Sequence, residues 1–215
     1  APDFLLMWDN AYCIHEFDGD FVPFADILSE CEKYGNADMV FEFASTSKVT
    51  LPGAGISCFA CSEANMEYMC KLIGIQAISF DKMNQLRHVK FLQNKKHTLA
   101  LMKEHAKILK PKFDMVVSTL EREIAPLGIA TWHKPKGGYF VSVNTAPGLA
   151  KRTLALCKEA GVVMTSAGAT YPYGHDPADS NIRVAPSLPP VEELEQAMAV
   201  FCCCLKLAAL EKSKK

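Results

Sequence analysis

Four side chains in this sequence could together bind and react with a small molecule that carries an amine and a carboxylate. Asp9 ends a short apolar run, and Tyr12 follows it three residues later. Lys48 lies on a loop of small and polar residues, and Arg183 lies in a short apolar segment near the C-terminal end. An uncharged lysine amine can attack a carbonyl carbon or carry a proton, and an arginine binds a carboxylate through two parallel hydrogen bonds. Taken singly, three of them have a plainer interpretation: Lys48 as a surface lysine, Asp9 as a turn-capping acid and Arg183 as half of a surface ion pair.

The elements expected around Asp9 and Lys48 alternate between strands and helices. Short apolar runs predict strands, and longer segments bounded by polar caps or glycine predict helices. The predicted strands cover residues 4–8, 39–44 and 56–60, with the first one buried, and the predicted helices cover residues 25–33 and 63–74. Gly35 is expected to end the first helix. Asp9 and Lys48 therefore follow the first and second strands.

A long helical region is expected over residues 81–123, and from Leu99 to Leu120 its apolar residues recur every three or four positions. Pro111 lies inside this region and should kink or split it. The remainder reads as a smaller α+β unit. Its predicted strands cover residues 137–143, 162–164 and 181–185, and its predicted helices cover residues 151–160 and 191–211.

The expected fold class is α/β, in three parts. Residues 1–80 form a partial large domain, residues 81–123 form a connecting helical region, and residues 124–215 form a small C-terminal domain. A sheet of only three strands leaves edges and faces exposed in a helix-covered fold. We therefore expect part of the large domain to lie upstream of Ala1, so that this chain is a C-terminal portion.

Four motifs carry a resemblance to a known enzyme family. They are Asp9-Asn10-Ala11-Tyr12, Ser45-Thr46-Ser47-Lys48 followed by Pro52-Gly53, Lys136-Gly137-Gly138-Tyr139-Phe140, and Asn181-Ile182-Arg183-Val184-Ala185-Pro186. In this order they resemble the C-terminal half of a pyridoxal 5'-phosphate (PLP) aminotransferase of fold type I, class I/II, over essentially the whole chain. The Ser-Thr-Ser-Lys sequence is similar to the one found in a divergent branch of the family, described as aspartate aminotransferase-like.

The resemblance implies a role for each residue around the cofactor ring. Lys48 would bind the cofactor aldehyde covalently and then move the substrate Cα proton as general base and acid. Asp9 would keep the pyridine nitrogen protonated, so that the ring accepts electrons. Tyr12 would hydrogen-bond the ring oxygen.

The resemblance also implies partners for two anionic groups. Ser45 would donate to the cofactor phosphate, and Arg183 would bind the substrate α-carboxylate as a fork that lysine cannot reproduce. Many relatives carry an arginine shortly after the Pro-Gly pair, and it pairs with the phosphate; here that stretch contains none. Ser47 and Thr50 are candidate donors in its place. Arg87 is a candidate cation, although a surface or domain-linking role is preferred for it.

The implied activity is transamination of an amino acid, with aspartate expected as donor and 2-oxoglutarate as acceptor. Enzymes of this fold are usually homodimers, so the parent protein is expected to be one. A lyase on the same fold is an alternative. A second alternative is a non-catalytic fragment, or the cofactor-sensing module of a transcription regulator, which would need a DNA-binding helix-turn-helix upstream. The retained Lys48, Asp9, Tyr12 and Arg183 favour an enzyme.

Composition and charge exclude several other classes. Lysine and arginine number 23 and aspartate and glutamate 24, giving a net charge of −1, which argues against a nucleic-acid-binding protein. No uncharged apolar run reaches membrane-spanning length. The six histidines show no metal-binding spacing, so no metal is expected.

The nine cysteines indicate a reducing compartment. Their number is odd and their spacing irregular, unlike a secreted disulfide framework. Cys58 and Cys61 have redox or zinc spacing, but no second pair or histidine partner lies near them in the sequence. We expect both, like Cys202, Cys203 and Cys204, to be structural cysteines packed in the interior, and the protein to be cytoplasmic.

Overall fold

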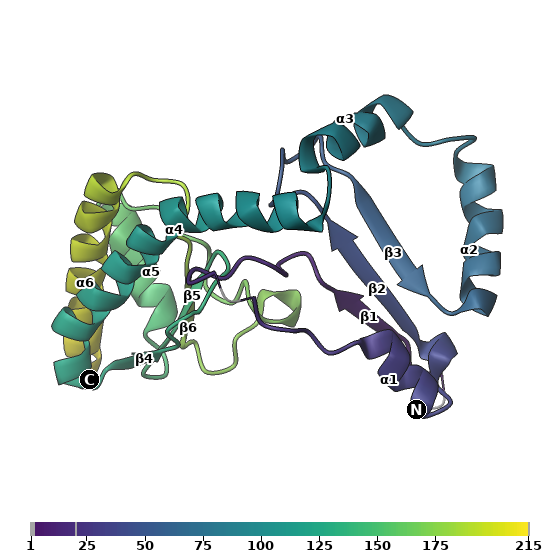
Figure 1. Ribbon diagram of the computed structural model, residues 1–215. Coiled ribbons are helices and arrows are strands. Elements are labelled where there is room, and N and C mark those ends of the chain that lie inside the picture. The colour runs from purple at the N-terminus through teal and green to yellow at the C-terminus, as the bar shows by residue number, and fades with distance from the viewer. Residues whose placement is uncertain (1–2, 20, 215) are drawn as a thin grey trace. The chain divides into compact units, whose positions relative to one another are not determined.

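The computed structural model describes residues 3–19 and 21–214 and divides into two compact units (Figure 1). The first unit comprises Ala1–Glu104 and the second His105–Lys215. Each unit contains a three-stranded sheet, so the expected α/β fold class is confirmed. The three-part division expected from the sequence stays a prediction.

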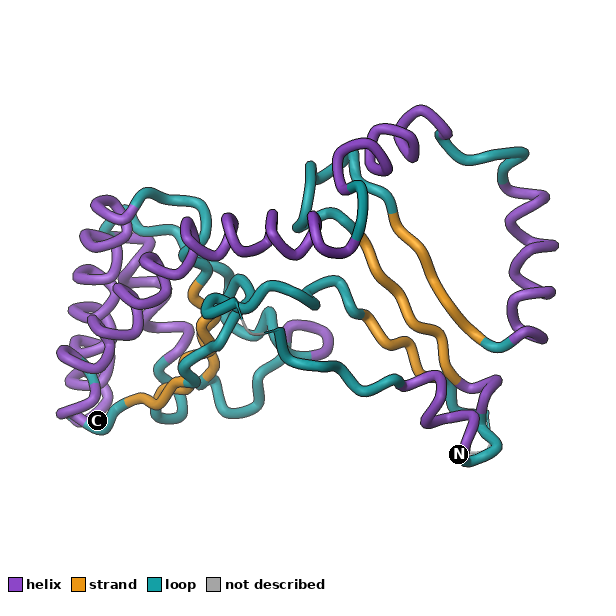
Figure 2. Tube along the Cα trace, viewed as in Figure 1, coloured by secondary structure: helices purple, strands orange, loops and turns teal. Residues whose placement is uncertain are grey.

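The sheet of the first unit carries the N-terminal candidate residues. Its elements are β1 (Leu6–Asp9), α1 (Ile27–Lys33), β2 (Val40–Ser45), β3 (Ser57–Cys61), α2 (Glu63–Gln76) and α3 (Lys82–Leu92), with a short 3-10 helix at Ala37–Met39. The strand order is β1-β2-β3, with β1 parallel and β3 antiparallel to β2. Figure 2 shows these strands side by side. The crossover through α1 is what allows β1 and β2 to run parallel.

Polar side chains fix where the helices of this unit begin. Asp26 caps α1, Ser62 caps α2 and Asp81 caps α3, each by accepting a hydrogen bond from a backbone N–H of the first turn. Gly35 has a φ of 71° and its N–H donates to the Glu32 carbonyl, which confirms it as the residue that ends α1.

The second unit has a well-packed core. It contains most of α4 (Lys95–Glu123), then β4 (Ala130–Trp132), β5 (Val141–Thr145), α5 (Ala150–Glu159), β6 (Asn181–Val184) and α6 (Val191–Ser213), with short 3-10 helices at Ala125–Leu127 and Pro172–Gly174. Both strand pairs, β4–β5 and β5–β6, are antiparallel. Alternate residues of β5 are buried, and so are one face of α4 and one of α6. This alternation is typical of a sheet covered on one side.

Three strand predictions need correction. No strand forms over residues 162–164: the Val162 N–H donates to the Cys157 carbonyl at the end of α5, and Val163 is exposed. That backbone group therefore serves the helix end rather than a sheet. The short strand β4 was not expected, and the strand expected over residues 137–143 begins only at Val141. The first strand is only partly buried, since Met7 is 72% exposed.

The long helical region is divided at a position that the sequence did not predict, and it is not split at Pro111. Pro111 lies inside a continuous α4, whereas the break falls at Gln93 and Asn94. Gln93 adopts φ 56° and ψ −64°, a strained conformation for a residue with a side chain. The Asn94 side chain accepts a hydrogen bond from the His97 N–H, which starts α4. A local cap therefore decides the boundary, and the proline does not.

The cysteines are only partly interior. Those buried are Cys157, Cys202 and Cys204, whereas Cys58, Cys70 and Cys203 are exposed and Cys61 is partly exposed. The expectation of interior packing is therefore wrong for Cys58 and Cys203. Adjacent residues of a helix point in different directions, so two members of the run in α6 can be buried while the one between them is not.

Candidate functional site

The ends of β1 and β2 bring two candidate residues to one face of the first unit's sheet. In the parallel register Asp9 pairs with Phe43, and Ser45 lies two residues beyond Phe43. Side chains two residues apart in a strand share a face, so Asp9 and Ser45 lie on the same side. Ser45 in turn pairs with Ser57 of β3. Ligands of α/β sheets bind at the carboxyl ends of strands, which is where Asp9 and Ser45 stand.

A cavity of about 940 Å³ opens on this face. Asp9, Ser45 and Ser57 supply polar groups from the strand ends, and Asp81 and Asn84 supply others from α3. Its remaining lining comes largely from apolar side chains: Met7, Phe43, Ala44, Ile56, Phe59, Met66, Ile73 and Phe80, among others. A concave, mostly apolar site with a few polar groups is typical of a small-molecule pocket.

Asp9 retains acceptor capacity at the edge of this cavity. One oxygen, Oδ1, accepts a hydrogen bond from the Ala11 N–H at 3.1 Å. The other, Oδ2, has no hydrogen-bond partner within residues 3–19 and 21–214. The next residue fixes the chain as it leaves β1: the Asn10 N–H donates to the Phe43 carbonyl, and its amide donates to Glu42. The structure thus leaves one carboxylate oxygen of Asp9 available for a donor.

Lys48 lies on a tight turn directly after β2. The Val49 and Thr50 N–H groups both donate to the Thr46 carbonyl, at 2.9 and 2.8 Å. Val49 is buried beneath the turn, whereas Lys48 is exposed. The Lys48 carbonyl lies 3.4 Å from Nε2 of His15. Lys48 does not line the cavity. The strand ends and the turn that carries Lys48 are therefore close in the sequence, but the turn does not form part of the cavity wall.

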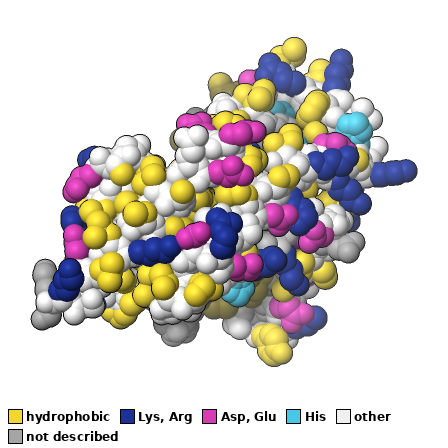
Figure 3. All heavy atoms as spheres, turned by 90° about the vertical axis from the view of Figure 1, so that its left-hand side faces the viewer, with side chains coloured by type: hydrophobic (Ala, Val, Ile, Leu, Met, Phe, Trp, Pro, Cys, Tyr) yellow, Lys and Arg dark blue, Asp and Glu magenta, His cyan; other side chains and the backbone are white. Residues whose placement is uncertain are grey.

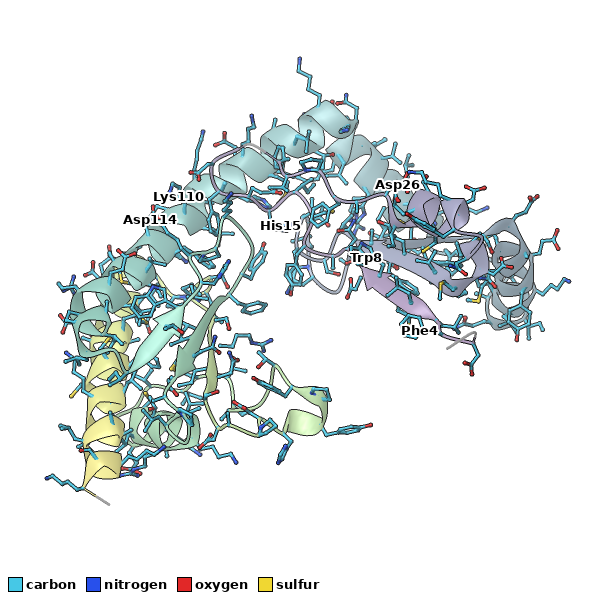
Figure 4. All side chains as sticks on the ribbon, turned by 90° about the horizontal axis from the view of Figure 1, so that it is seen from below. Phe4, Trp8, His15, Asp26, Lys110 and Asp114 are labelled. Carbon is cyan, nitrogen blue, oxygen red and sulfur yellow. The ribbon has the colours of Figure 1, made fainter. Side chains whose placement is uncertain are left out.

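Tyr12 and His15 form the segment that follows β1. Their rings meet edge to face with centroids 6.1 Å apart. Tyr12 is 44% exposed, whereas His15, which is labelled in Figure 4, is 5% exposed. Nδ1 of His15 lies 2.7 Å from the Cys13 carbonyl. Because Nε2 also faces a carbonyl, that of Lys48, His15 connects the segment carrying Tyr12 to the lysine turn.

Ser45 and Ser47 bring two hydroxyls together next to Lys48. Their Oγ atoms are 3.3 Å apart, and both residues are partly exposed. Arg87 of α3, the candidate cation, is exposed and its Nη1 lies 3.5 Å from Oδ1 of Asn84 in the same helix. This contact agrees with the preferred surface role of Arg87 and does not test its binding to phosphate.

Arg183 belongs to the second unit, on β6, where it pairs with Ser142 of β5. Its guanidinium carbon lies 4.5 Å from the centroid of the Phe140 ring, a cation–π contact. The buried Nε atom of Arg183 has no hydrogen-bond partner in the described part of the chain. Phe140, from the Gly-Gly-Tyr-Phe motif, thus supports the arginine from one side.

Buried polar groups fix the start of β6 and hence the position of Arg183. The Asn181 amide donates to Oδ1 of Asn144 at 2.7 Å and to Oγ of Ser142 at 2.9 Å. The buried carboxylate of Asp176 accepts hydrogen bonds from the N–H groups of Asn181, Ser180 and Ala178, and these bonds lower the pKa of Asp176. The segment before β6 is therefore held by its own backbone donors.

The structure places five of the six predicted site residues in the first unit and Arg183 in the second. Asp9 and Ser45 line one cavity, while Tyr12, Ser47 and Lys48 stand on the two loops that leave β1 and β2. Sequence reasoning missed the two buried histidines, His15 and His88, that contact the lysine turn. Their sequence neighbours give no signal, because both contacts join residues more than thirty positions apart.

Comparisons with known proteins agree on one family. A family model described as aspartate amino-transferase matches residues 1–215. An aspartate aminotransferase of Corynebacterium glutamicum is 44% identical over 211 residues, which are 98% of this chain and 49% of that protein. The chain therefore spans about half the length of the curated relatives it matches.

Solved structures show the same fold. The crystal structure of an aspartate transaminase from Corynebacterium glutamicum superposes with a TM-score of 0.96 at 44% identity, covering 99% of this chain and 50% of that one. A multiple substrate aminotransferase from Thermococcus profundus superposes with a TM-score of 0.78 at 20% identity, covering 97% and 49%. At that identity the second match supports the fold alone.

The described residues include neither a membrane-spanning helix nor a metal-binding cluster. No helix there is both long and apolar enough to cross a membrane. Nor do their histidines, cysteines and acids include a group of three or more that could hold a metal ion. On the face shown in Figure 3, acidic and basic side chains are interspersed among apolar ones, and neither sign of charge dominates.

Proposed function

The chain belongs to the aspartate aminotransferase family. We propose that it supplies two residues of a PLP-dependent aminotransferase site: the lysine that binds the cofactor and the acid that keeps the cofactor's ring nitrogen protonated. The observation that carries this proposal is Lys48 on the turn after β2, beside the parallel strand that ends in Asp9. Because the relatives are about twice as long as this chain, the activity, substrates and partners of the whole protein are part of the proposal.

The residues present suit the groups that PLP offers. The cofactor carries a ring nitrogen that can be protonated, a ring oxygen, a phosphate and an aldehyde. Asp9 presents a carboxylate oxygen that has no hydrogen-bond partner among the described residues, at the edge of a cavity with mostly apolar walls. Tyr12 offers a phenol, and Lys48 offers an amine. When bound, PLP supplies an electron-withdrawing ring that accepts the electron pair left on a substrate carbon.

Lys48 has two tasks in this scheme. Its amine would hold the cofactor through the aldehyde. Once substrate displaces it, the same amine would take the proton from the substrate Cα and deliver it to the cofactor carbon. Asp9 provides the negative charge that holds a proton on the ring nitrogen. Tyr12 donates to the ring oxygen.

Ser45 and Ser47 are better phosphate donors than Thr50. Their hydroxyls lie 3.3 Å apart, at the end of β2 and on the loop that follows it. The Thr50 hydroxyl is already within 3.2 Å of three acceptors, the Thr46 carbonyl, the Thr46 hydroxyl and the His88 ring. It therefore has little capacity left for a phosphate. Neutral hydroxyls do not balance the negative charge of the phosphate. Arg87 or another segment of the chain would supply the cation that does.

Substrate recognition falls to Arg183 in this proposal. Its guanidinium, stacked on Phe140, binds the α-carboxylate as a planar fork. We propose aspartate as the amino donor and 2-oxoglutarate as the acceptor, in a cytoplasmic homodimer. The name of the Corynebacterium glutamicum relative, an aspartate aminotransferase, supports the choice of donor.

Transamination by the full-length protein tests the proposed function. We expect it to convert aspartate and 2-oxoglutarate to oxaloacetate and glutamate when PLP is supplied. Lys48→Ala should lower the rate by about a thousandfold or more, because the proton-transferring amine is gone. Lys71→Ala, which changes an exposed lysine of α2, is the matched control and should not affect the rate. A protein that converts no amino acid would contradict the proposal.

A further inference from the structure

The loop that carries Lys48 is fastened at its base. The Thr46 N–H donates to the Ile56 carbonyl at 2.9 Å, and the Ile56 N–H donates to Oγ1 of Thr46 at 3.0 Å. Gly55 lies so close that an added Cβ would stand 3.0 Å from this same Oγ1. The segment from Thr46 to Ile56 is therefore closed at both ends.

Helix α3 contacts this closed segment at two points. Nδ2 of Asn84 donates to the Gly55 carbonyl at 3.1 Å. One turn further along the helix, Nε2 of His88 lies 3.0 Å from Oγ1 of Thr50. His88 is 4% exposed and is the one buried residue of α3, all of whose residues are described. The helix thus uses its single buried side chain to contact a residue two positions from Lys48.

The hydrogen bonds of His88 fix the direction of this contact. Nδ1 lies 2.9 Å from the Asn84 carbonyl, which can only accept. In the neutral ring Nδ1 therefore carries the proton, and Nε2 accepts from the Thr50 hydroxyl. Thr50 in turn lies 3.1 Å from Oγ1 of Thr46. A continuous chain of hydrogen bonds thus runs from the backbone of α3 to the base of the lysine turn.

We propose that His88 is a positioning residue, which acts through Thr50 to hold the turn so that the Lys48 amine is aimed at its target. This inference rests on the proposed function. Lys48 is two residues from Thr50, on a turn closed by the Thr50 N–H. A shift of Thr50 therefore displaces Lys48, and a displacement of about 1 Å can cost a large factor in rate. His88 itself does not touch the reacting atoms in this account.

Two matched pairs of variants separate this role from ordinary packing. The Asn side chain in His88→Asn can reach the Asn84 carbonyl but not Thr50, whereas the longer Gln side chain in His88→Gln extends to the position of Nε2. Thr50→Val keeps the shape of the side chain and removes the hydroxyl, whereas Thr50→Ser keeps the hydroxyl. If His88 only filled space, the variants that remove the hydrogen bond, His88→Asn and Thr50→Val, would not be slower than the variants that keep it, His88→Gln and Thr50→Ser.

The readout is the rate at which PLP and borohydride label Lys48 in the full-length protein, normalised to the exposed Lys71 in the same sample. We expect His88→Asn and Thr50→Val each to slow labelling by about tenfold, as expected for one lost positioning contact. His88→Gln and Thr50→Ser should stay within about threefold of the natural chain, which is a loss of less than 1 kcal/mol. The double variant His88→Asn, Thr50→Val should add little, because both remove the same link.

Steady-state kinetics provide a second readout in the same proteins. The first member of each pair should lower kcat for aspartate with little change in KM, because Lys48 moves and the substrate carboxylate site does not. Thermal unfolding identifies a variant that fails to fold, and in that case the isosteric Thr50→Val carries the test. Equal rates in all variants, or equal losses within each pair, would overturn the proposal. Failure of the natural chain to label Lys48 at all would instead contradict the proposed function.

Discussion

Burial decides which cysteines of this chain can react. Burial, together with the neighbouring Cys204 and Cys202 thiols, raises the pKa of Cys157 to about 12. Burial likewise raises the pKa of Cys202 to about 11. Since the thiolate is the reactive form, both thiols are inert near neutral pH. Cys203, between two buried neighbours, is exposed.

We predict that iodoacetamide at about pH 8 alkylates Cys203 in the folded protein before it alkylates Cys157, Cys202 or Cys204. Peptide mass mapping over a time course measures this directly. The same protein in denaturant is the control, because all four thiols should then react at similar rates. Equal rates for Cys202 and Cys203 in the folded state would show that α6 does not bury the first of them.

At the scale of elements, the loop between α5 and β6 depends on one glycine. Gly168 has a φ of 82°, and a Cβ added there would overlap the Gly174 carbonyl group. Gly174 also has a positive φ, 69°, but an added Cβ would meet nothing within 4 Å. The two positions therefore share the conformational cost of a side chain and differ in the steric clash.

We predict that Gly168→Ala lowers the free energy of unfolding by about 2 kcal/mol more than Gly174→Ala does. Equilibrium urea denaturation of the two variants and the natural chain measures the difference. Gly174→Ala is the matched control, since it carries only the cost of a positive φ, about 1 kcal/mol. Similar losses in both variants would mean that the carbonyl of residue 174 moves aside without cost.

The elements also show what sequence patterns can and cannot predict. The strands over 39–44 and 181–185 were predicted within a residue or two, because each is a short, largely apolar segment bounded by polar residues or proline. The strand over 162–164 has the same pattern, but its first N–H closes α5 instead. The sequence predicted one helical region across Gln93, whereas the side-chain cap at Asn94 sets the true helix boundary.

The candidate site was predictable to different degrees. Asp9 and Ser45 could be placed at strand ends, and Lys48 on the loop after the second strand, because their own sequence neighbours form those strands. The contact between His88 and Thr50 could not, because it joins residues 38 positions apart and depends on how α3 packs. Sequence patterns show which element carries a reactive residue, but they do not predict the long-range hydrogen bonds that hold that residue in place.

At the scale of the whole molecule, the candidate residues are divided between two units. Arg183, the proposed carboxylate ligand, belongs to the second unit, and the proposed cofactor residues belong to the first. The chain aligns with about half of each relative's length. In this proposal, the first unit therefore contributes a lysine on the turn after β2 that binds PLP.

Mapping the PLP-modified peptide after borohydride reduction of the full-length protein tests that claim most directly. We predict a single dominant label on Lys48, present at near-stoichiometric PLP and absent from Lys48→Ala. The exposed Lys71 and Lys95 provide the internal reference for surface labelling. A label spread evenly over surface lysines, with no excess at Lys48, would contradict the account.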